Sequence, residues 1–322
     1  MMHEHLLLPG IDICSLSLPS AYKDWLEGWL RQIEEDLEQG DVSSSACLMG
    51  VMTELVLQGS VQTDWCKILD DYLTRNGMPI AYSEAYGKRL HKFSQWRQTP
   101  VHCIHTRWWI ERVCGEKPSS FAGLIQRFVQ PNGWIYNPQV SETRLQLRME
   151  SEYMMSMAMG LEILACEEQL QNRDKFIATL ASKSLTKHLS AEYFRIVALR
   201  TLGALNQAPC NLAELLSRCE TETGYSDFSV ESKVDDYMGS AKRVSRDKVV
   251  PSPLASLYAG VISERCEKAV QDGVREKLRS FGEHLKKNPE DIPPFQIRDI
   301  PVPFGPGLSP LEVIAASYLV SL

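Results

Sequence analysis

The sequence predicts an all-α protein, an irregular multi-helix bundle of roughly ten helices with an extended proline-rich segment before the C-terminal helix. Apolar residues recur at three- and four-residue steps in nearly every segment, which is the spacing of one face of an α-helix. Strand patterns are weak by comparison and are confined to short stretches around 101–113 and 134–136. The 322 residues, of which 44% are hydrophobic, suffice for one large domain or two smaller ones.

The first helices differ in how much of their surface is apolar. Over 20–40, apolar residues follow one face and acidic residues follow the other, as in an amphipathic surface helix. The next segment, 46–57, has one charged residue, Glu54, and is apolar around most of its circumference, which predicts a helix inside the bundle. A third stripe covers 65–72 and ends before Gly77.

Two further stripes occupy the middle of the chain. One covers 121–128 and ends at the turn Pro131-Asn132-Gly133. The other starts near Ser141 and reaches Leu164, so it is the longest helix expected in this half. Its uncharged centre, 153–161, is rich in Met, and we expect it to be core because flexible Met side chains fill irregular gaps between helices.

The last third combines long helices with a proline-rich arm. Helices are expected over 190–205, 211–219 and 253–287, the last with a kink near Gly273. Seven prolines between 289 and 310 then force an extended path. After them, Ser309-Pro310-Leu311-Glu312 has the pattern of a capping box with Pro at the first helical position, which predicts a final helix to the C-terminus.

A domain boundary is expected in the polar, charged stretch 221–248, where the apolar stripes thin out. This interpretation gives a main helical domain over 1–220 and a C-terminal helical region over 221–322 that includes the proline-rich arm. The alternative is one continuous domain over 1–322.

The cellular compartment is suggested by the cysteines and by the apolar runs. Nine cysteines, an odd number without any C-x-x-C pair, favour a reduced cytoplasmic interior in which most thiols act as small apolar residues. The N-terminus lacks the basic flank of a signal peptide. The longest charge-free stretch, 249–263, is shorter than the roughly 18 residues of a membrane span, so no membrane is expected among the partners.

Common catalytic signatures do not occur in this sequence. It contains no nucleophile elbow, no phosphate-binding Walker loop, no H-E-x-x-H and no zinc-type pair of C-x-x-C motifs. Catalytic residues therefore stay unassigned, and a protein without enzymatic activity is favoured.

His102 and His105 are the candidate metal ligands. If Pro100 opens a helix, the two imidazoles lie roughly 60° apart around its axis and could bind one ion together with a carboxylate from elsewhere. If the segment is a strand, they point to opposite faces. We expect them to be core groups and predict no cofactor, with a metal or haem as the alternative. His5 lies near an N-terminus that is expected to be mobile, so it is a weaker candidate.

Charge is distributed very unevenly along the chain, although the net charge is only −7. Residues 1–72 contain three Lys and Arg against thirteen Asp and Glu, a balance of −10. Residues 73–148 contain eleven against four, a balance of +7, and the remainder has a balance of −4. The whole-chain charge is therefore a poor guide to the partner.

The basic stretch 73–148 is also rich in aromatic residues, a combination that nucleic-acid grooves use to bind phosphates and stack bases. The polyanion-binding candidates in its densest part are Lys88, Arg89, Lys92, Trp96 and Arg97. The favoured interpretation is nevertheless that these cations pair with the acidic N-terminal helices of the same chain or of a partner. Nucleic acid and an acidic protein partner are the alternatives.

These observations predict a non-catalytic helical scaffold or adaptor subunit of a larger intracellular assembly. Its partner is expected to be another protein or a second copy of the chain. The first alternative is a subunit that contacts nucleic acid through 73–148. The second is a metal- or haem-dependent helical enzyme with its site near His102 and His105.

Overall fold

The computed structural model describes residues 4–38, 44–76, 100–115, 120–136, 150–227, 251–292 and 309–322. Within these ranges the chain forms twelve α-helices, and β structure is limited to isolated bridges, so the all-α prediction is confirmed. The helices are α1 (Ser20–Glu38), α2 (Ser44–Gln58), α3 (Trp65–Asn76), α6 (Pro100–Val113), α7 (Ala122–Gln126), α8 (Glu150–Cys166), α9 (Arg173–Ala181), α10 (Leu189–Thr201), α11 (Leu212–Cys219), α12 (Pro253–Ser263), α13 (Lys268–Lys287) and α14 (Pro310–Ser321).

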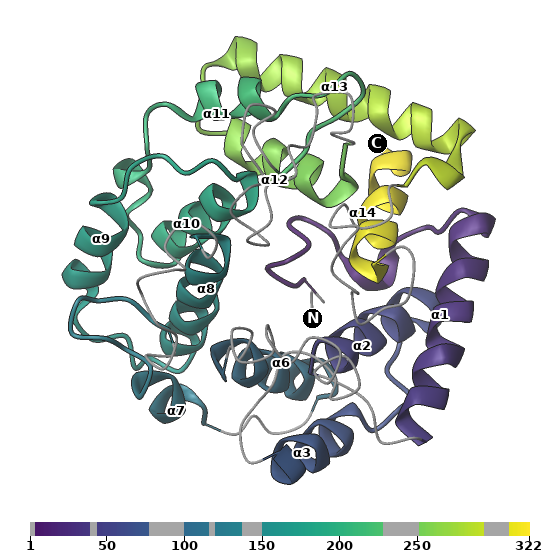
Figure 1. Cartoon of the computed structure of the whole chain (residues 1–322), viewed down its shortest axis with the longest axis horizontal. Coiled ribbons are helices and arrows are strands. Elements are labelled where there is room, and N and C mark those ends of the chain that lie inside the picture. The colour runs from purple at the N-terminus through teal and green to yellow at the C-terminus, as the bar shows by residue number, and fades with distance from the viewer. Residues whose placement is uncertain are drawn as a thin grey trace, which may run out of the picture.

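Six of these helices form a closed inner ring (Figure 1). Each packs against the next in the order α2, α6, α8, α10, α12 and α14, and α14 packs against α2 to close the ring. The other helices lie outside it: α1 covers α2 and α14, α3 covers α2 and α6, and α13 covers α12 and α14. The N-terminal segment runs through the middle of the ring (Figure 1).

The apolar pattern of each helix explains its layer. Helix α14 in the inner ring buries nine residues, from Pro310 to Leu319, because it touches neighbours on several sides. Helix α1 in the outer layer buries Tyr22, Leu26, Trp29 and Ile33 along one face and leaves its acidic face exposed. Surface and interior helices are thus distinguished as their sequence patterns predict.

The Met-rich centre of α8 is core, as predicted. Met154, Met157 and Met159 are buried, and α8 packs most closely against α10. The described part of this helix begins at Glu150, and the expected start near Ser141 lies outside the described residues.

The predicted single helix over 253–287 is wrong. The chain forms two helices, α12 and α13, separated by a short turn in which Glu267 has extended backbone. Gly273, where a kink was expected, lies inside α13. The turn lets α13 fold back on α12, so its amphipathic face is buried against α12 and α14 instead of continuing outward.

The remaining predictions concern two possible strands, one further helix and two polar or proline-rich stretches. The segment 101–113 is helical, and 134–136 contributes only the isolated bridge Val129↔Ile135, because neither finds a partner strand in the described chain. Helix α9 was not expected from the sequence. The proline-rich arm at 293–308 and most of the expected domain boundary, 228–250, lie outside the described residues.

The predicted capping box at Ser309 forms only in part. The Ser309 side chain accepts a hydrogen bond from Leu311 N, as expected for an N-cap followed by Pro310. Glu312 instead reaches α12: its carboxylate accepts from Ser252 Oγ at 2.7 Å and from Leu254 N at 2.9 Å. The carboxylate of Glu312, in the first turn of α14, therefore caps the N-terminus of α12 and joins the two helices.

This buried carboxylate makes stability depend on pH. Burial raises the pKa of Glu312 from its ordinary 4.5 to about 7, against the lowering effect of its two hydrogen-bond donors. Between these values the folded chain keeps a proton that the unfolded chain has lost, so the free energy of unfolding falls as pH rises. We expect this fall to be about 2 kcal/mol. Glu312→Gln should remove it in urea unfolding at pH 5 and pH 8. The exposed Glu283→Gln is the control, and an unchanged difference in Glu312→Gln would contradict the prediction.

Candidate functional site

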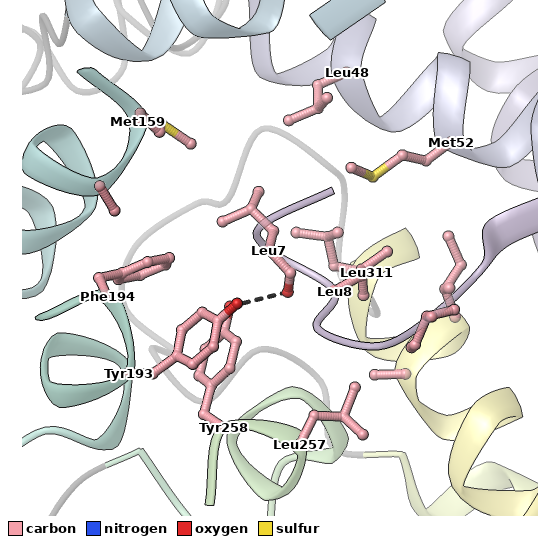
Figure 2. Packing of buried hydrophobic residues seen from close by; sticks show 14 of the residues in the cluster. Leu7, Leu8, Leu48, Met52, Met159, Tyr193, Phe194, Leu257, Tyr258 and Leu311 are labelled. Atoms are coloured by element: carbon pink, nitrogen blue, oxygen red, sulfur yellow. Dashed lines mark hydrogen bonds between the residues drawn. The ribbon is translucent and has the colours of Figure 1, made fainter. Parts of the chain in front are cut away.

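The middle of the inner ring is filled by a tight turn of the N-terminal segment (Figure 2). Leu8 N donates to His5 O at 2.8 Å, and Leu7 N donates to the His5 ring at Nδ1 at 3.1 Å. These bonds fold residues 5–8 back on themselves. Leu7 and Leu8 are both buried as a result.

Three side chains of the ring hold the backbone of this turn. Trp109 Nε1 of α6 donates to Glu4 O at 3.0 Å, and Tyr258 of α12 donates through its hydroxyl to Leu7 O at 3.1 Å. The hydroxyl of Tyr193 in α10 donates to Leu6 O. The segment is thus bound through its carbonyl oxygens by donors from three different helices.

Tyr193 and Tyr258 form a matched pair of donors. Their rings stack with centroids 4.2 Å apart and an angle of 8° between the planes. Burial raises the pKa of both phenols, so both hydroxyls keep their protons and act as donors.

Aliphatic, aromatic and sulfur-containing side chains surround Leu7 and Leu8. In Figure 2, other side chains of the buried cluster lie on several sides of the two leucines. These are Leu48 and Met52 of α2, Met159 of α8, Tyr193 and Phe194 of α10, Leu257 and Tyr258 of α12, and Leu311 of α14.

His102 and His105 lie on α6, so the helical alternative for this segment holds. His105 is buried, and its Nε2 lies 2.7 Å from Glu162 Oε2 of α8. Within the described ranges, no three His, Cys, Asp or Glu side chains are placed to hold a metal ion together. The structure therefore joins one of the two candidate ligands to a carboxylate but does not assemble a metal centre from the described residues.

His5 joins these histidines, so the expectation of a mobile terminus is wrong for this residue. Its ring packs edge-on against His105, with centroids 5.3 Å apart, and against Trp109, at 4.8 Å. His5 Nε2, His102 Nε2 and His105 Nδ1 are buried without a hydrogen-bond partner among the described residues. The apolar run Leu6-Leu7-Leu8 after His5 was the signal in the sequence that this end could be buried.

The imidazoles of His5, which is buried, and of His102, whose Nε2 is buried, predict a loss of stability in acid. Burial lowers the pKa of His102 to about 4, and it also lowers that of His5, with the neighbouring imidazoles adding to the effect. As pH falls from 6.5 to 4, the unfolded chain binds protons that the folded chain excludes, so the free energy of unfolding decreases. We expect His102 to contribute about 2 kcal/mol of this decrease between pH 7 and pH 4.5. Urea unfolding of His102→Leu should show a correspondingly smaller acid loss, and an acid loss equal to that of the unmodified chain would contradict the assignment.

The polyanion-binding candidates Lys88, Arg89, Lys92, Trp96 and Arg97 all lie outside the described residues. Among the described cations of the basic stretch, Arg107 binds Asp70 through two hydrogen bonds of 2.8 and 3.0 Å and pairs with Glu111 at 2.8 Å. The guanidinium of Arg112 lies 4.7 Å from the centre of the Trp108 ring. At Arg107, therefore, the basic stretch pairs with the acidic N-terminal part of the same chain.

The structure also shows the burial of the cysteines and the apolar length of the helices. All nine cysteines are free; four of them are buried, two are intermediate and three are exposed. Across the part of the chain that the structure describes, no helix combines the length and the apolar character needed to cross a bilayer.

No family model, curated protein or solved structure matches this chain.

Proposed function

We propose that this protein is a non-catalytic helical scaffold or adaptor subunit of a larger intracellular assembly. The observation that carries the proposal is that Leu7 and Leu8 of the chain itself fill the middle of the inner ring. Helical bundles usually build cofactor and substrate sites in that position, from side chains on facing helices. With its centre occupied, the resting molecule recognises other molecules through its outer layer.

The outer face of α1 carries several exposed acidic side chains. Asp24, Glu34 and Glu35 are exposed, and none of the three forms an ion pair within the described chain. Lys23 pairs with Glu27 on this helix at 3.9 Å. Such a face favours a partner protein with a basic surface, by steering and by complementarity.

We place the protein in the cytoplasm. Nine free thiols, three of them exposed, suit a reducing compartment, because exposed cysteines in an oxidising one tend to form disulfides.

Gentle purification of the tagged full chain from its native cells tests the proposal. We expect a complex much heavier than the 36.4 kDa chain, with at least one partner in fixed stoichiometry. Recovery of the chain as a monomer under these conditions would rule the scaffold out. A high ratio of absorbance at 260 nm to that at 280 nm would support the nucleic-acid alternative, and bound metal or a haem spectrum would support the enzyme alternative.

Charge reversal locates the docking face. Replacing Asp24, Glu34 and Glu35 with lysine should release the partner and leave the helical far-UV spectrum unchanged. The control replaces Glu276 and Glu283 with lysine, two charge reversals on the exposed face of α13, and it should retain the partner. Equal retention by both variants would exclude α1 as the docking face.

A further inference from the structure

The space that Leu7 and Leu8 occupy has the chemistry of a ligand site. We propose that it binds an apolar small molecule that carries a carbonyl or carboxyl oxygen, of the fatty-acid class, and that residues 4–8 are an internal occupant which this molecule displaces. The proposal goes beyond the scaffold role and does not depend on it.

The lining suits the body of such a molecule. Once Leu7 and Leu8 leave, the side chains around them that belong to the ring are aliphatic, aromatic or thioether groups from five helices (Figure 2). Binding sites for small molecules are typically lined in this way, with a few placed polar groups that orient the ligand. Met52 and Met159 add adaptability, because unbranched thioether side chains can adjust to different shapes.

The polar groups of the lining select for an acceptor oxygen. Tyr193, Tyr258 and Trp109 already donate to three carbonyl oxygens, those of Leu6, Leu7 and Glu4. Stacking of the two tyrosine rings holds their hydroxyls beside each other, so a single carboxyl group could accept from both. Displacing the turn without supplying such an acceptor would leave buried donors unsatisfied, which is costly.

The N-terminal turn is well placed to be displaced. Residues 4–8 lie outside every described helix, so their displacement need not break one of these elements. The bound turn also leaves two buried nitrogen atoms without a hydrogen-bond partner among the described residues. These are Nε2 of His5, in the turn itself, and Nδ1 of the neighbouring His105. Its departure would return His5 to water and open the space to a ligand, as in a cryptic pocket.

Binding of cis-parinaric acid, a fluorescent fatty acid, to the full chain tests the proposal. Leu8→Ala weakens the hold of the turn, raises the fraction of open molecules and should tighten binding of the probe at least about tenfold over the unmodified chain. Leu180→Ala is the matched control: Leu180 is equally buried, but it lies on α9 in the outer layer. We expect its affinity to stay within about twofold of the unmodified chain. Equal tightening in both variants would show general loosening and overturn the proposal.

Two further measurements test the place and the chemistry of binding. A synthetic peptide of residues 3–10 should displace the probe from the Leu8→Ala chain, because it restores the internal occupant; failure to compete would overturn the site. Adding Tyr258→Phe to Leu8→Ala should weaken cis-parinaric acid binding about tenfold and leave binding of pyrene, which has no oxygen, unchanged. Equal losses for both probes, or none for either, would overturn the assignment of the carboxyl group to the tyrosine pair.

Discussion

Replacing Gly282 with alanine is expected to lower the free energy of unfolding by about 3 kcal/mol or more, because α13 and α14 touch backbone to backbone at this residue. A Cβ atom at Gly282 would lie 2.7 Å from the carbonyl carbon of Leu319 and closer still to its oxygen. Neither atom belongs to a side chain that could rotate away. The extra methyl group must therefore push α14 off α13, and α14 is the helix that closes the inner ring against α2.

Gly273→Ala on the same helix is the control for this prediction. No atom lies within 4 Å of a Cβ built at Gly273, so the substitution adds helix propensity without a clash. It should raise the free energy of unfolding by about 0.5–1 kcal/mol. Urea unfolding of the two variants measures both effects, and a Gly282→Ala chain as stable as Gly273→Ala would show that the two helices do not meet as described.

Replacing Arg195 with leucine is expected to cost about 3–5 kcal/mol, because it leaves a buried carboxylate without its cation. Arg195 and Glu192 of α10 are both almost completely buried, with Arg195 Nη1 3.4 Å from Glu192 Oε1. Arg195 also donates to Lys183 O at 2.7 Å and to Ser184 O at 3.2 Å, and Glu192 accepts from Thr186 N at 2.8 Å. The pair thus fixes the turn between α9 and α10 through the backbone groups of Lys183, Ser184 and Thr186.

The exposed pair Arg218 and Glu214 provides the comparison. Both side chains are about half exposed, at 46% and 50%, and they lie one turn apart on α11. Arg218→Ala should change the free energy of unfolding by no more than about 0.5 kcal/mol, because water screens the charges. Thermal or urea unfolding decides the matter: similar losses for Arg195→Leu and Arg218→Ala would mean that the buried pair is not needed to hold the turn.

The sequence predicted the helices and their layers well because both depend on local periodicity. The one-sided apolar pattern of α1 is typical of a helix that packs through one face. The nearly uniform apolar character of α2 and α14 is typical of a helix with neighbours on several sides. The break between α12 and α13 was missed because the helical pattern continues through it. Only the packing of α13 back onto α12 reveals where the chain turns.

The candidate site could be predicted only in fragments. His102 and His105 were found because they lie three residues apart on one helix, a spacing that the sequence displays. His5 was ranked as a weaker candidate because the N-terminus was expected to be mobile, although the apolar run Leu6-Leu7-Leu8 beside it indicated burial. Tyr193 and Tyr258 were not predicted, because their hydroxyls meet the N-terminal turn from residues far along the chain.

By itself, the sequence determined an all-α chain with inner and outer helices, nine cysteines and a strongly uneven charge. The tertiary structure decided what fills the ring, which carboxylate caps α12 and which cation meets Asp70. The physical reason is the range of the interactions: a helix is specified by contacts three and four residues apart, whereas the bond from Tyr258 to Leu7 joins residues 251 positions apart. Such contacts exist only once the ring has closed.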